Sequence, residues 1–263
     1  MSKARQAPIA CPKLPSQLTT LTYEFPHGQL VPEHFHPEDQ LVYASRGVMT
    51  VRTPDGAWVV PAQRAVWIPA RVPHSIVMSG AVSMRTLYLR ARLARRLPRT
   101  CCVVNVSPLL RELILHACSF RTLNRRSRVQ RHLIDLIVDQ LDTVQTILLQ
   151  LPNPADPRAL RVAETLQRDP SDQSSLEEVC QQAGASKRTI ERLFQHETHL
   201  SLGKWRQQLR LLRSLELLAA GEKLTHAAFE AGYSTPSAFI AMFRKVLGVT
   251  PGKYFENASN GKG

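Results

Sequence analysis

Three prolines within residues 151–157 divide this sequence into two parts of different pattern. Proline lacks the amide hydrogen that a helix interior needs and restricts the residue before it, so this stretch cannot form a helix. Before it, from residue 21 to 90, apolar residues come in short runs separated by Pro and Gly. After it, helical patterns continue almost to the last residue. Residues 152–157 therefore predict a stiff linker between two domains, and an α+β multidomain protein.

The first part has the pattern of a strand-rich domain. Runs rich in Val, Tyr, Ile, Trp and Thr predict strands at residues 40–45, 48–53, 57–60, 65–68, 75–79 and 83–89. Pro54-Asp55-Gly56 predicts a hairpin turn, and Arg46-Gly47 a second tight turn. Short strands at this spacing favour an antiparallel sandwich or small barrel over residues 21–104, after a tail of residues 1–20.

Residues 105–151 change to a helical period. Leu109, Leu113, His116 and Phe120 fall on one helix face, and Leu133, Ile137, Leu141, Val144, Leu148 and Leu151 on another. The second stripe is narrow and heptad-like, which suits a seam between helices, so it predicts a homodimer interface. The alternative is that this stripe packs on the barrel of its own chain.

Two similar units follow the linker. Residues 174–178 have the pattern of a capping box, residues 183–185 form a Gly turn, and Ile190 and Phe194 predict the buried stripe of the next helix. The plan repeats with a turn at 231–233 and a second helix that buries Phe239 and Phe243. A short helix, a Gly turn and a second helix is the helix-turn-helix plan. We predict two of them in residues 158–256, followed by a tail of residues 257–263.

These units resemble the AraC/XylS family of transcription regulators. The matching stretches are GASKRTIERLF (184–194), LRLLRSLELL (209–218), AGYSTPSAFIAMFR (231–244) and LGVTP (247–251), with Tyr254 after them. The resemblance covers residues 158–256. It implies that two recognition helices enter successive major-groove segments of a double-stranded DNA operator.

The resemblance also implies DNA-contacting residues. Arg188, Glu191 and Arg192 match positions that contact bases or nearby backbone, because Arg can bind guanine and Glu can accept from cytosine. A phosphate contact or salt bridge is the alternative for Arg192. In the second unit Ala241 stands where the family often has a base-reading Arg, so readout there is expected to be weak or through shape. The remaining candidates for DNA or phosphate contact, or for the polar face of these helices, are Ser186, Lys187, Gln195, Thr235, Ser237, Arg244 and Lys245.

The first domain resembles a cupin. Gly28-x5-His34-x-His36-x3-Gln40-x6-Gly47 is similar to the first cupin motif, with Gln40 where Glu is usual, and His74 belongs to a partial second motif. The resemblance covers residues 20–90, looks most like the NimR-like subgroup of AraC regulators, and implies a sensor of a small molecule or metal. His34 and His36 point to one face of an extended chain.

With His74 and the Gln40 amide, these histidines could bind Zn, Ni, Cu or Fe, although the missing carboxylate argues against a metal. The alternatives are a relic of the fold and an organic-ligand pocket without metal. No cofactor is required, and a divalent transition metal is the optional one. Residues that line a pocket or join the core are Tyr43, Trp58, Trp67, Arg85 and Tyr88.

Charge and composition agree with a regulator. The net charge is +13, and residues 90–131 hold eleven Arg against the single acid Glu112. Such a balance points to a polyanionic partner. Five cysteines without a C-x-x-C pair, no long apolar run and no secretory signal predict a cytoplasmic protein without a membrane partner. We predict a regulator that is not an enzyme and that contacts RNA polymerase if it activates. The alternatives are a metal-dependent cupin isomerase or dioxygenase, and sequence-blind nucleic-acid binding through residues 90–131.

Overall fold

The computed structural model describes residues 17–61, 64–90, 93, 97–143, 146–147 and 149–259. They form two compact units. The first contains residues up to 53 and residues 60–148, and the second contains residues 54–59 and the chain from 149 onward. No helix among the described residues combines the length and the apolar character that a membrane crossing needs.

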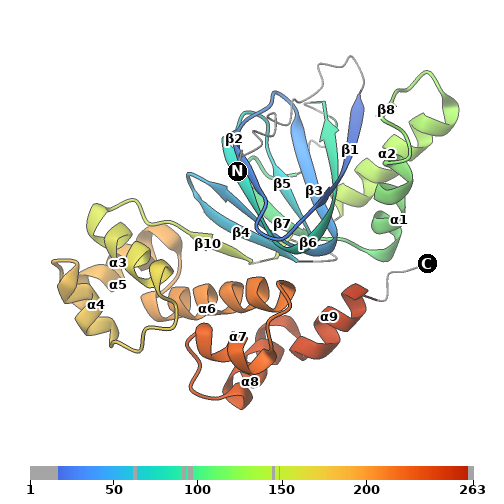
Figure 1. The fold of residues 1–263 in the computed structure, drawn as a ribbon. Helices are drawn as coiled ribbons and strands as arrows, with labels where there is room; N and C mark the ends of the chain where they lie inside the picture. The colour runs from blue at the N-terminus through green and yellow to red at the C-terminus, as the bar shows by residue number, and fades with distance from the viewer. Residues whose placement is uncertain are drawn as a thin grey trace, which may run out of the picture. The chain divides into compact units, whose positions relative to one another are not determined.

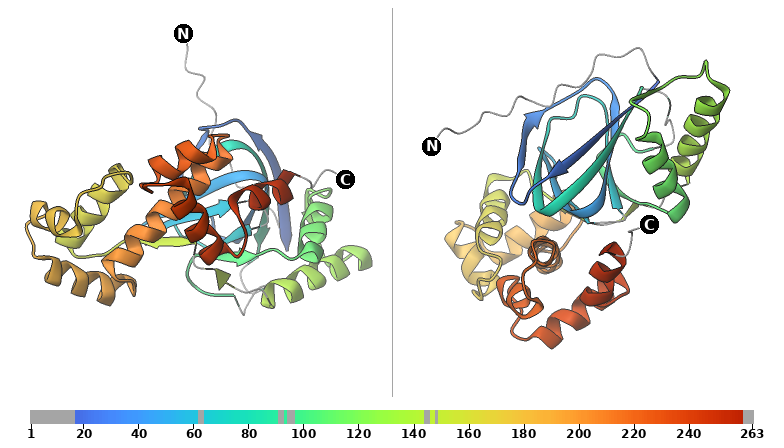
Figure 2. Two further views of the ribbon diagram at one scale, coloured as in Figure 1. Left: turned by 90° about the horizontal axis from the view of Figure 1, so that it is seen from below. Right: turned by 45° about the vertical axis from the view of Figure 1, so that its right-hand side comes forward.

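The first unit is an antiparallel barrel (Figures 1 and 2). Its strands are hydrogen-bonded in the order β8-β1-β6-β3-β5-β7-β9, and β2 also pairs with β6. The long strands β3 and β6 run antiparallel, with Gln40 opposite Tyr88, and β2 places His34 opposite His74. The bounds are β1 Leu18–Phe25, β2 Leu30–His34, β3 Asp39–Thr53, β4 Gly56–Pro61, β5 Arg64–Ile68, β6 His74–Leu89, β7 Cys102–Asn105, β8 Thr122–Leu123 and β9 Thr146–Ile147.

Four predicted strands form two continuous ones. Residues 40–45 and 48–53 both lie in β3, and residues 75–79 and 83–89 both lie in β6. The tight turn predicted at Arg46-Gly47 is wrong, because the register shifts there without ending the strand. Gly47 has φ +79°, and a Cβ at this position would lie 2.5 Å from the Ala81 carbonyl oxygen. Strand β1 begins at Leu18, inside the predicted tail, whose residues 1–16 lie outside the described ranges.

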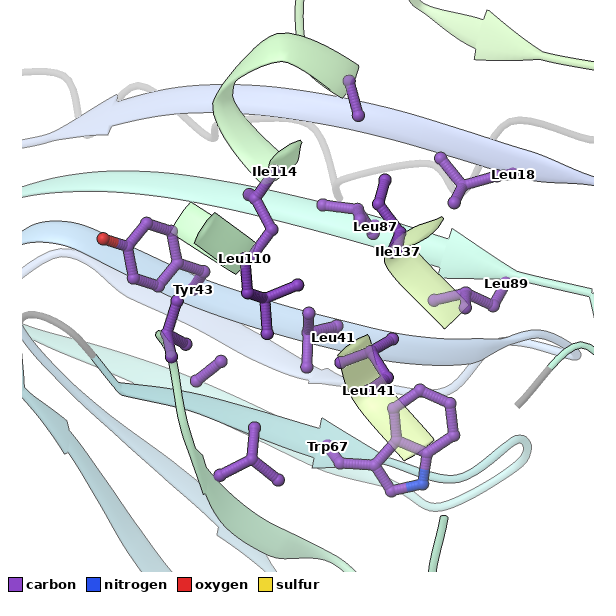
Figure 3. Close-up of a cluster of buried hydrophobic side chains, with 14 of the residues drawn as sticks. Leu18, Leu41, Tyr43, Trp67, Leu87, Leu89, Leu110, Ile114, Ile137 and Leu141 are labelled. Atoms are coloured by element: carbon purple, nitrogen blue, oxygen red, sulfur yellow. The ribbon is translucent and has the colours of Figure 1, made fainter. Parts of the chain in front are cut away.

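Two helices cover the barrel beside β1 (Figures 1 and 2). Helix α1 is Pro108–Ala117 and helix α2 is Arg128–Asp142. The hydroxyls of Ser107 and Ser127 cap them by accepting from backbone N–H groups, which satisfies donors that a helix start leaves open. Their buried residues join Leu18 and Leu41 in one hydrophobic cluster (Figure 3).

The predicted dimer seam in residues 105–151 requires correction. Leu133, Ile137 and Leu141 belong to the cluster of Figure 3 and are buried against strands of their own barrel. Helix α2 ends at Asp142, so Leu151 is not part of its stripe and lies in strand β10. The side chains of Val144 and Leu148 lie outside the described residues. The stripe is narrow because it fits a barrel surface.

The second unit begins with the proline-rich stretch. Strand β10, Gln150–Pro152, pairs antiparallel with residues 56–58 of β4, so the linker predicted at 152–157 starts inside a strand. Asp156 then caps helix α3, and Pro157 occupies its first turn, where proline is tolerated. Within the predicted linker, residues 153–156 are the part that lies in neither helix nor strand.

The rest of this unit is helical (Figure 1). The capping box predicted at residues 174–178 is present, with Ser175 and Glu178 as its two members. Phe194 and Trp205 stack edge to face in one part of the core, and Phe239 and Phe243 in another. Helix α9 continues to Ser259, beyond the predicted start of the tail. The helices are α3 Pro157–Arg168, α4 Leu176–Gln182, α5 Lys187–Thr198, α6 Leu202–Ala219, α7 Leu224–Glu230, α8 Pro236–Leu247 and α9 Pro251–Ser259.

Candidate functional sites

Helix α5 is the first candidate recognition helix. Gly184 takes φ +78° in the turn before it, and the Ser186 hydroxyl caps it by accepting from the Thr189 N–H at 3.3 Å. Ile190 and Phe194 are fully buried. The opposite face exposes Lys187, Arg188, Arg192 and Gln195. Residues 188, 192 and 195 follow the helical repeat, so two guanidinium groups and an amide lie on one open face.

Glu191 does not join this face. Its Oε2 accepts a hydrogen bond from the Leu202 N–H at 3.0 Å, at the first turn of α6. A carboxylate at a helix N-terminus is stabilised by the unpaired N–H groups and by the helix dipole. The DNA contact of Glu191 stays a prediction, and in this structure one of its carboxylate oxygens makes a contact within the domain. The sequence pattern gave no signal for this, because residue 202 lies on the next helix.

Helix α8 is the second candidate recognition helix, and its open face carries little polar chemistry. The Thr235 hydroxyl caps the helix by accepting from the Ala238 N–H at 3.1 Å. Val246 is exposed near the end of the helix, and the other exposed positions are Ser237, Ala238, Ala241, Arg244 and Lys245. Only the last two are long polar side chains, and both lie in the last turns. The weak second readout stays a prediction, since exposure shows only which side chains are available.

Three histidines meet on the barrel strands. The rings of His34 and His74 are 4.3 Å apart between centroids, and those of His36 and His74 are 5.1 Å apart. Each Nδ1 faces a backbone carbonyl oxygen: Pro32 at 2.8 Å for His34, Glu38 at 2.7 Å for His36 and Val72 at 2.9 Å for His74. Because a carbonyl oxygen only accepts, each Nδ1 carries the hydrogen. In a neutral imidazole the Nε2 is then left with a lone pair.

Burial keeps the two inner rings neutral. Removal from water lowers the pKa of His74 to about 4 and also lowers the pKa of His36, because a buried imidazolium loses its hydration. The His74 Nε2 is buried and has no hydrogen-bond partner. A buried polar atom without a partner is costly unless a ligand completes it. The Nε2 of His74 is therefore the atom of this cluster that most clearly indicates a ligand.

The Gln40 amide extends the cluster. Its Oε1 lies 2.8 Å from the His36 Nε2, and its Nε2 donates to the Thr86 Oγ1 at 2.9 Å. His36 therefore faces an oxygen at both ring nitrogens, yet a neutral imidazole has only one N–H to donate. The contact is satisfied when the Gln40 amide is turned over, so that its N–H₂ donates to the His36 Nε2.

The predicted pocket residues do not gather in one place. Tyr88 lies edge-on to the His36 ring at 5.0 Å, so it joins the histidine cluster. Tyr43 and Trp67 belong to the hydrophobic cluster under α1 and α2, and Arg85 pairs with Glu24 at 2.9 Å. Trp58 is buried in the segment that pairs with β10. Alternation along a strand sends neighbouring residues to opposite faces, which separates Tyr43 and Trp67 from the histidines.

Two family models match the chain. Residues 20–152 match the AraC-like ligand binding domain, and residues 179–257 match a helix-turn-helix domain. The chain is 36% identical over 223 residues to the HTH-type transcriptional regulator NimR of Escherichia coli (strain K12), covering 85% of this chain and 81% of NimR. It is 35% identical over 103 residues to the HTH-type transcriptional regulator RipA of Corynebacterium glutamicum, covering 39% and 31% of the two chains.

A solved structure aligns with most of the chain. Unsaturated fatty acid-bound ToxT from Vibrio cholerae strain SCE256 aligns over 93% of this chain and 96% of its own, with 11% identity and a TM-score of 0.40. The family assignment depends on the two domain models and on the match to NimR over most of both chains. The chain therefore belongs to the AraC family of transcriptional regulators, with a ligand-binding first domain and a helix-turn-helix DNA-binding domain.

Proposed function

We propose that this regulator binds its operator chiefly through α5 and that an effector at the histidine cluster changes this binding. The observation that carries the DNA part is the open face of α5. Arg188, Arg192 and Gln195 share this face, while Ile190 and Phe194 of the same helix are buried. Arg side chains on an exposed recognition helix can bind guanine edges with two hydrogen bonds. Helix α8 then reads the second half-site through the shape of the DNA, with phosphate contacts from Arg244 and Lys245.

Footprinting tests the DNA part. The full-length protein is incubated with the intergenic DNA upstream of its own gene and with a shuffled control of the same composition. We expect a protected site that spans two helical turns or more, because two recognition helices lie in successive grooves. If no fragment is protected, even in a genome-wide selection of bound fragments, the regulator does not read DNA as proposed.

The chemistry of the histidine cluster limits the effector. Neutral rings with Nδ1 bound to carbonyls offer Nε2 lone pairs, so a ligand must present hydrogen-bond donors or a cation. An anion is disfavoured, because burial opposes the protonation that would let His36 and His74 attract it. Binding of such a ligand would shift the population of DNA-binding conformations.

A divalent transition metal is one such cation. Imidazoles that donate their second ring nitrogen to backbone carbonyls have the outer support that metal-binding histidines use. Within the described ranges, however, no group of three or more His, Cys, Asp or Glu side chains is arranged to hold a metal ion. The present side-chain positions therefore do not fit a metal, and we propose an organic donor as the effector. Titration with Zn²⁺ and Ni²⁺, each with a chelator control, distinguishes the two.

We further propose that the first domain senses rather than catalyses and that the protein acts on DNA in the cytoplasm. Gln40 is a neutral amide held by Thr86, which supports a sensing role over metal catalysis with an anionic ligand. If the regulator activates transcription, RNA polymerase is its second macromolecular partner. Reporter transcription with and without the effector tests the direction of control.

We also propose a homodimer, through the outer face of α2. Val129 is 67% exposed and Leu136 41% exposed on this helix. Its first half exposes Arg131 and its second half exposes Asp139. This order opposes the helix dipole, so it does not serve the stability of the isolated helix.

A second copy explains this order of charges. When two α2 helices cross antiparallel near Leu136, the basic half of each lies against the acidic half of the other. A two-fold interface of this kind presents the same residues from both protomers. The apolar side chains of Val129 and Leu136 would lose their exposure to water in the same contact.

A further inference from the structure

Two arginines of α6 hold the loop that leads into the first helix-turn-helix. Arg210 donates from Nε to the Pro170 carbonyl at 3.1 Å and from Nη2 to the Asp172 carbonyl at 3.0 Å. Arg206 donates to the Ser174 carbonyl at 2.9 Å and also to the Asp172 carbonyl. The loop between α3 and α4 is therefore fixed to α6 by its backbone. Because Ser175 caps α4 directly after this loop, α4 and α5 are positioned from it.

The turn of the second helix-turn-helix meets the same group. Gly232, between α7 and α8, has φ +81°. A Cβ there would lie 2.6 Å from the Arg210 Cζ and Nε and 2.6 Å from the Pro170 carbonyl oxygen. Gln173 of the loop also donates from Nε2 to the Gly232 carbonyl at 3.3 Å. The loop, the guanidinium and the turn thus touch one another within the second unit.

The guanidinium charge of Arg210 is partly buried at this junction, and it donates hydrogen bonds to two carbonyl oxygens. Burial and the neighbouring Arg206 lower the pKa of Arg210, yet an arginine stays protonated in proteins. Its planar guanidinium reaches two carbonyl oxygens in fixed directions, which a lysine ammonium cannot reproduce in the same way. The junction is therefore rigid in direction as well as in distance.

We propose that the Arg210 junction fixes the separation and rotation of the two recognition helices, so that the protein reads two half-sites only at one spacing. This inference rests on the proposed reading of DNA by both α5 and α8. One base pair added between the half-sites moves the second by about 3.4 Å and turns it by about 34° around the axis. A rigid pair of helices cannot follow this displacement, whereas two loosely joined units can. Arg210 is a positioning residue here and does not itself contact DNA.

The test compares spacing preference between variants. A bound site is selected from random-sequence DNA with the full-length protein, and fragments are made with one or two base pairs inserted or deleted between the half-sites. A fragment with only the α5 half-site completes the set of probes. Arg210→Gln and Gly232→Ala are compared with Arg213→Gln, which lies on the same helix in an exposed ion pair with Glu216. Arg210→Lys keeps the charge and serves as the conservative variant.

We expect the wild type and Arg213→Gln to lose tenfold or more in affinity on respaced sites. In Arg210→Gln and Gly232→Ala the difference in affinity between the natural and the respaced sites should shrink to threefold or less, because these variants bind the natural spacing more weakly. Their affinity for the single half-site should equal that of the wild type. Arg210→Lys should lie between the two. Circular dichroism and thermal unfolding confirm that each variant is folded.

Two outcomes overturn the inference. If folded Arg210→Gln keeps the full spacing preference of the wild type, the junction does not set the spacing. If it loses the same factor on every probe, including the single half-site, Arg210 serves stability or α5 alone. A wild type without any preferred DNA would overturn the proposed function itself, and that result is visible before any variant is made.

Discussion

At the scale of single residues, Arg192 carries the sharpest prediction about DNA. It is exposed one helical turn from Arg188 on the open face of α5. If it binds a base edge, Arg192→Ala should weaken binding to the selected site by about 1–3 kcal/mol and leave binding to scrambled DNA unchanged. Fluorescence anisotropy on both fragments measures this, with Arg168→Ala, a change of an exposed arginine on helix α3, as the control. An equal loss on both fragments would make Arg192 a phosphate contact.

Glu191 gives the opposite prediction from its neighbour. Its carboxylate accepts from the Leu202 N–H and does not face the open side of α5. Glu191→Ala should lower the free energy of unfolding of the DNA-binding unit by about 1–2 kcal/mol, because a charged acceptor at a helix start is lost. Denaturant unfolding measures the stability, and selection from random DNA measures base preference. A changed base at one position of the selected site would confirm the DNA role predicted from sequence.

At the scale of elements, α2 predicts how two copies associate. Asp139→Arg places like charges opposite one another twice in a two-fold dimer, so it should shift the protein toward monomer. The double variant Arg131→Asp with Asp139→Arg restores opposite charges and should recover the dimer. Sedimentation equilibrium measures this, and Arg121→Asp, an exposed charge reversal outside α2, is the matched control. A dimer that is unaffected by Asp139→Arg uses another surface.

Elements also show what sequence reasoning could reach. The capping box at Ser175 and the turns at Gly184 and Gly232 follow from local patterns, and all three are present. The long strands β3 and β6 were predicted in halves, because a bulge at Gly47 interrupts the pattern as a turn does. The α2 stripe was assigned to a partner because periodicity shows that a face is buried but not what buries it. The Arg210 contacts link positions far apart in sequence and left no local signal.

The same limit applies to the candidate sites. His34 and His36 were paired from their spacing, and His74 from a partial motif, and the structure brings all three rings together. Tyr43 and Trp67 are predicted to line a pocket or join the core, and they join the hydrophobic core. The DNA contacts of Arg188 and Lys187 stay predictions, since exposure shows only that they are available.

At the scale of the whole molecule, the buried histidines make stability depend on pH. The folded pKa of His74 is about 4, below the ordinary 6.5, so between these values the unfolded chain binds a proton that the folded chain does not. The free energy of unfolding should therefore fall as pH drops from 6.5 to 4, by up to about 3 kcal/mol from His74. Below pH 4 His74 should cause no further fall. His36 and His34 are the titratable groups facing His74, and His36 acts in the same direction.

Thermal unfolding of the wild type and of His74→Asn over this pH range measures the effect. The variant should lose most of the slope, whereas His116→Asn, an exposed histidine of α1, should keep it. A slope unchanged in His74→Asn would mean that carboxylates rather than this histidine set the acid sensitivity.

The pairing of residues 56–58 with β10 has a consequence for how such regulators recombine. The compact unit that carries both helix-turn-helix motifs includes six residues, 54–59, from the middle of the sensor sequence. Gly56 fits there because a Cβ would lie 2.3 Å from the Leu151 carbonyl oxygen, and the Trp205 indole donates to the Pro152 carbonyl at 2.8 Å. A chimaera joined at the prolines would therefore pair residues 54–59 of one regulator with the β10 strand of another. Successful grafts should carry a matching glycine with the hairpin, so the two halves of this regulator are not freely exchangeable cassettes.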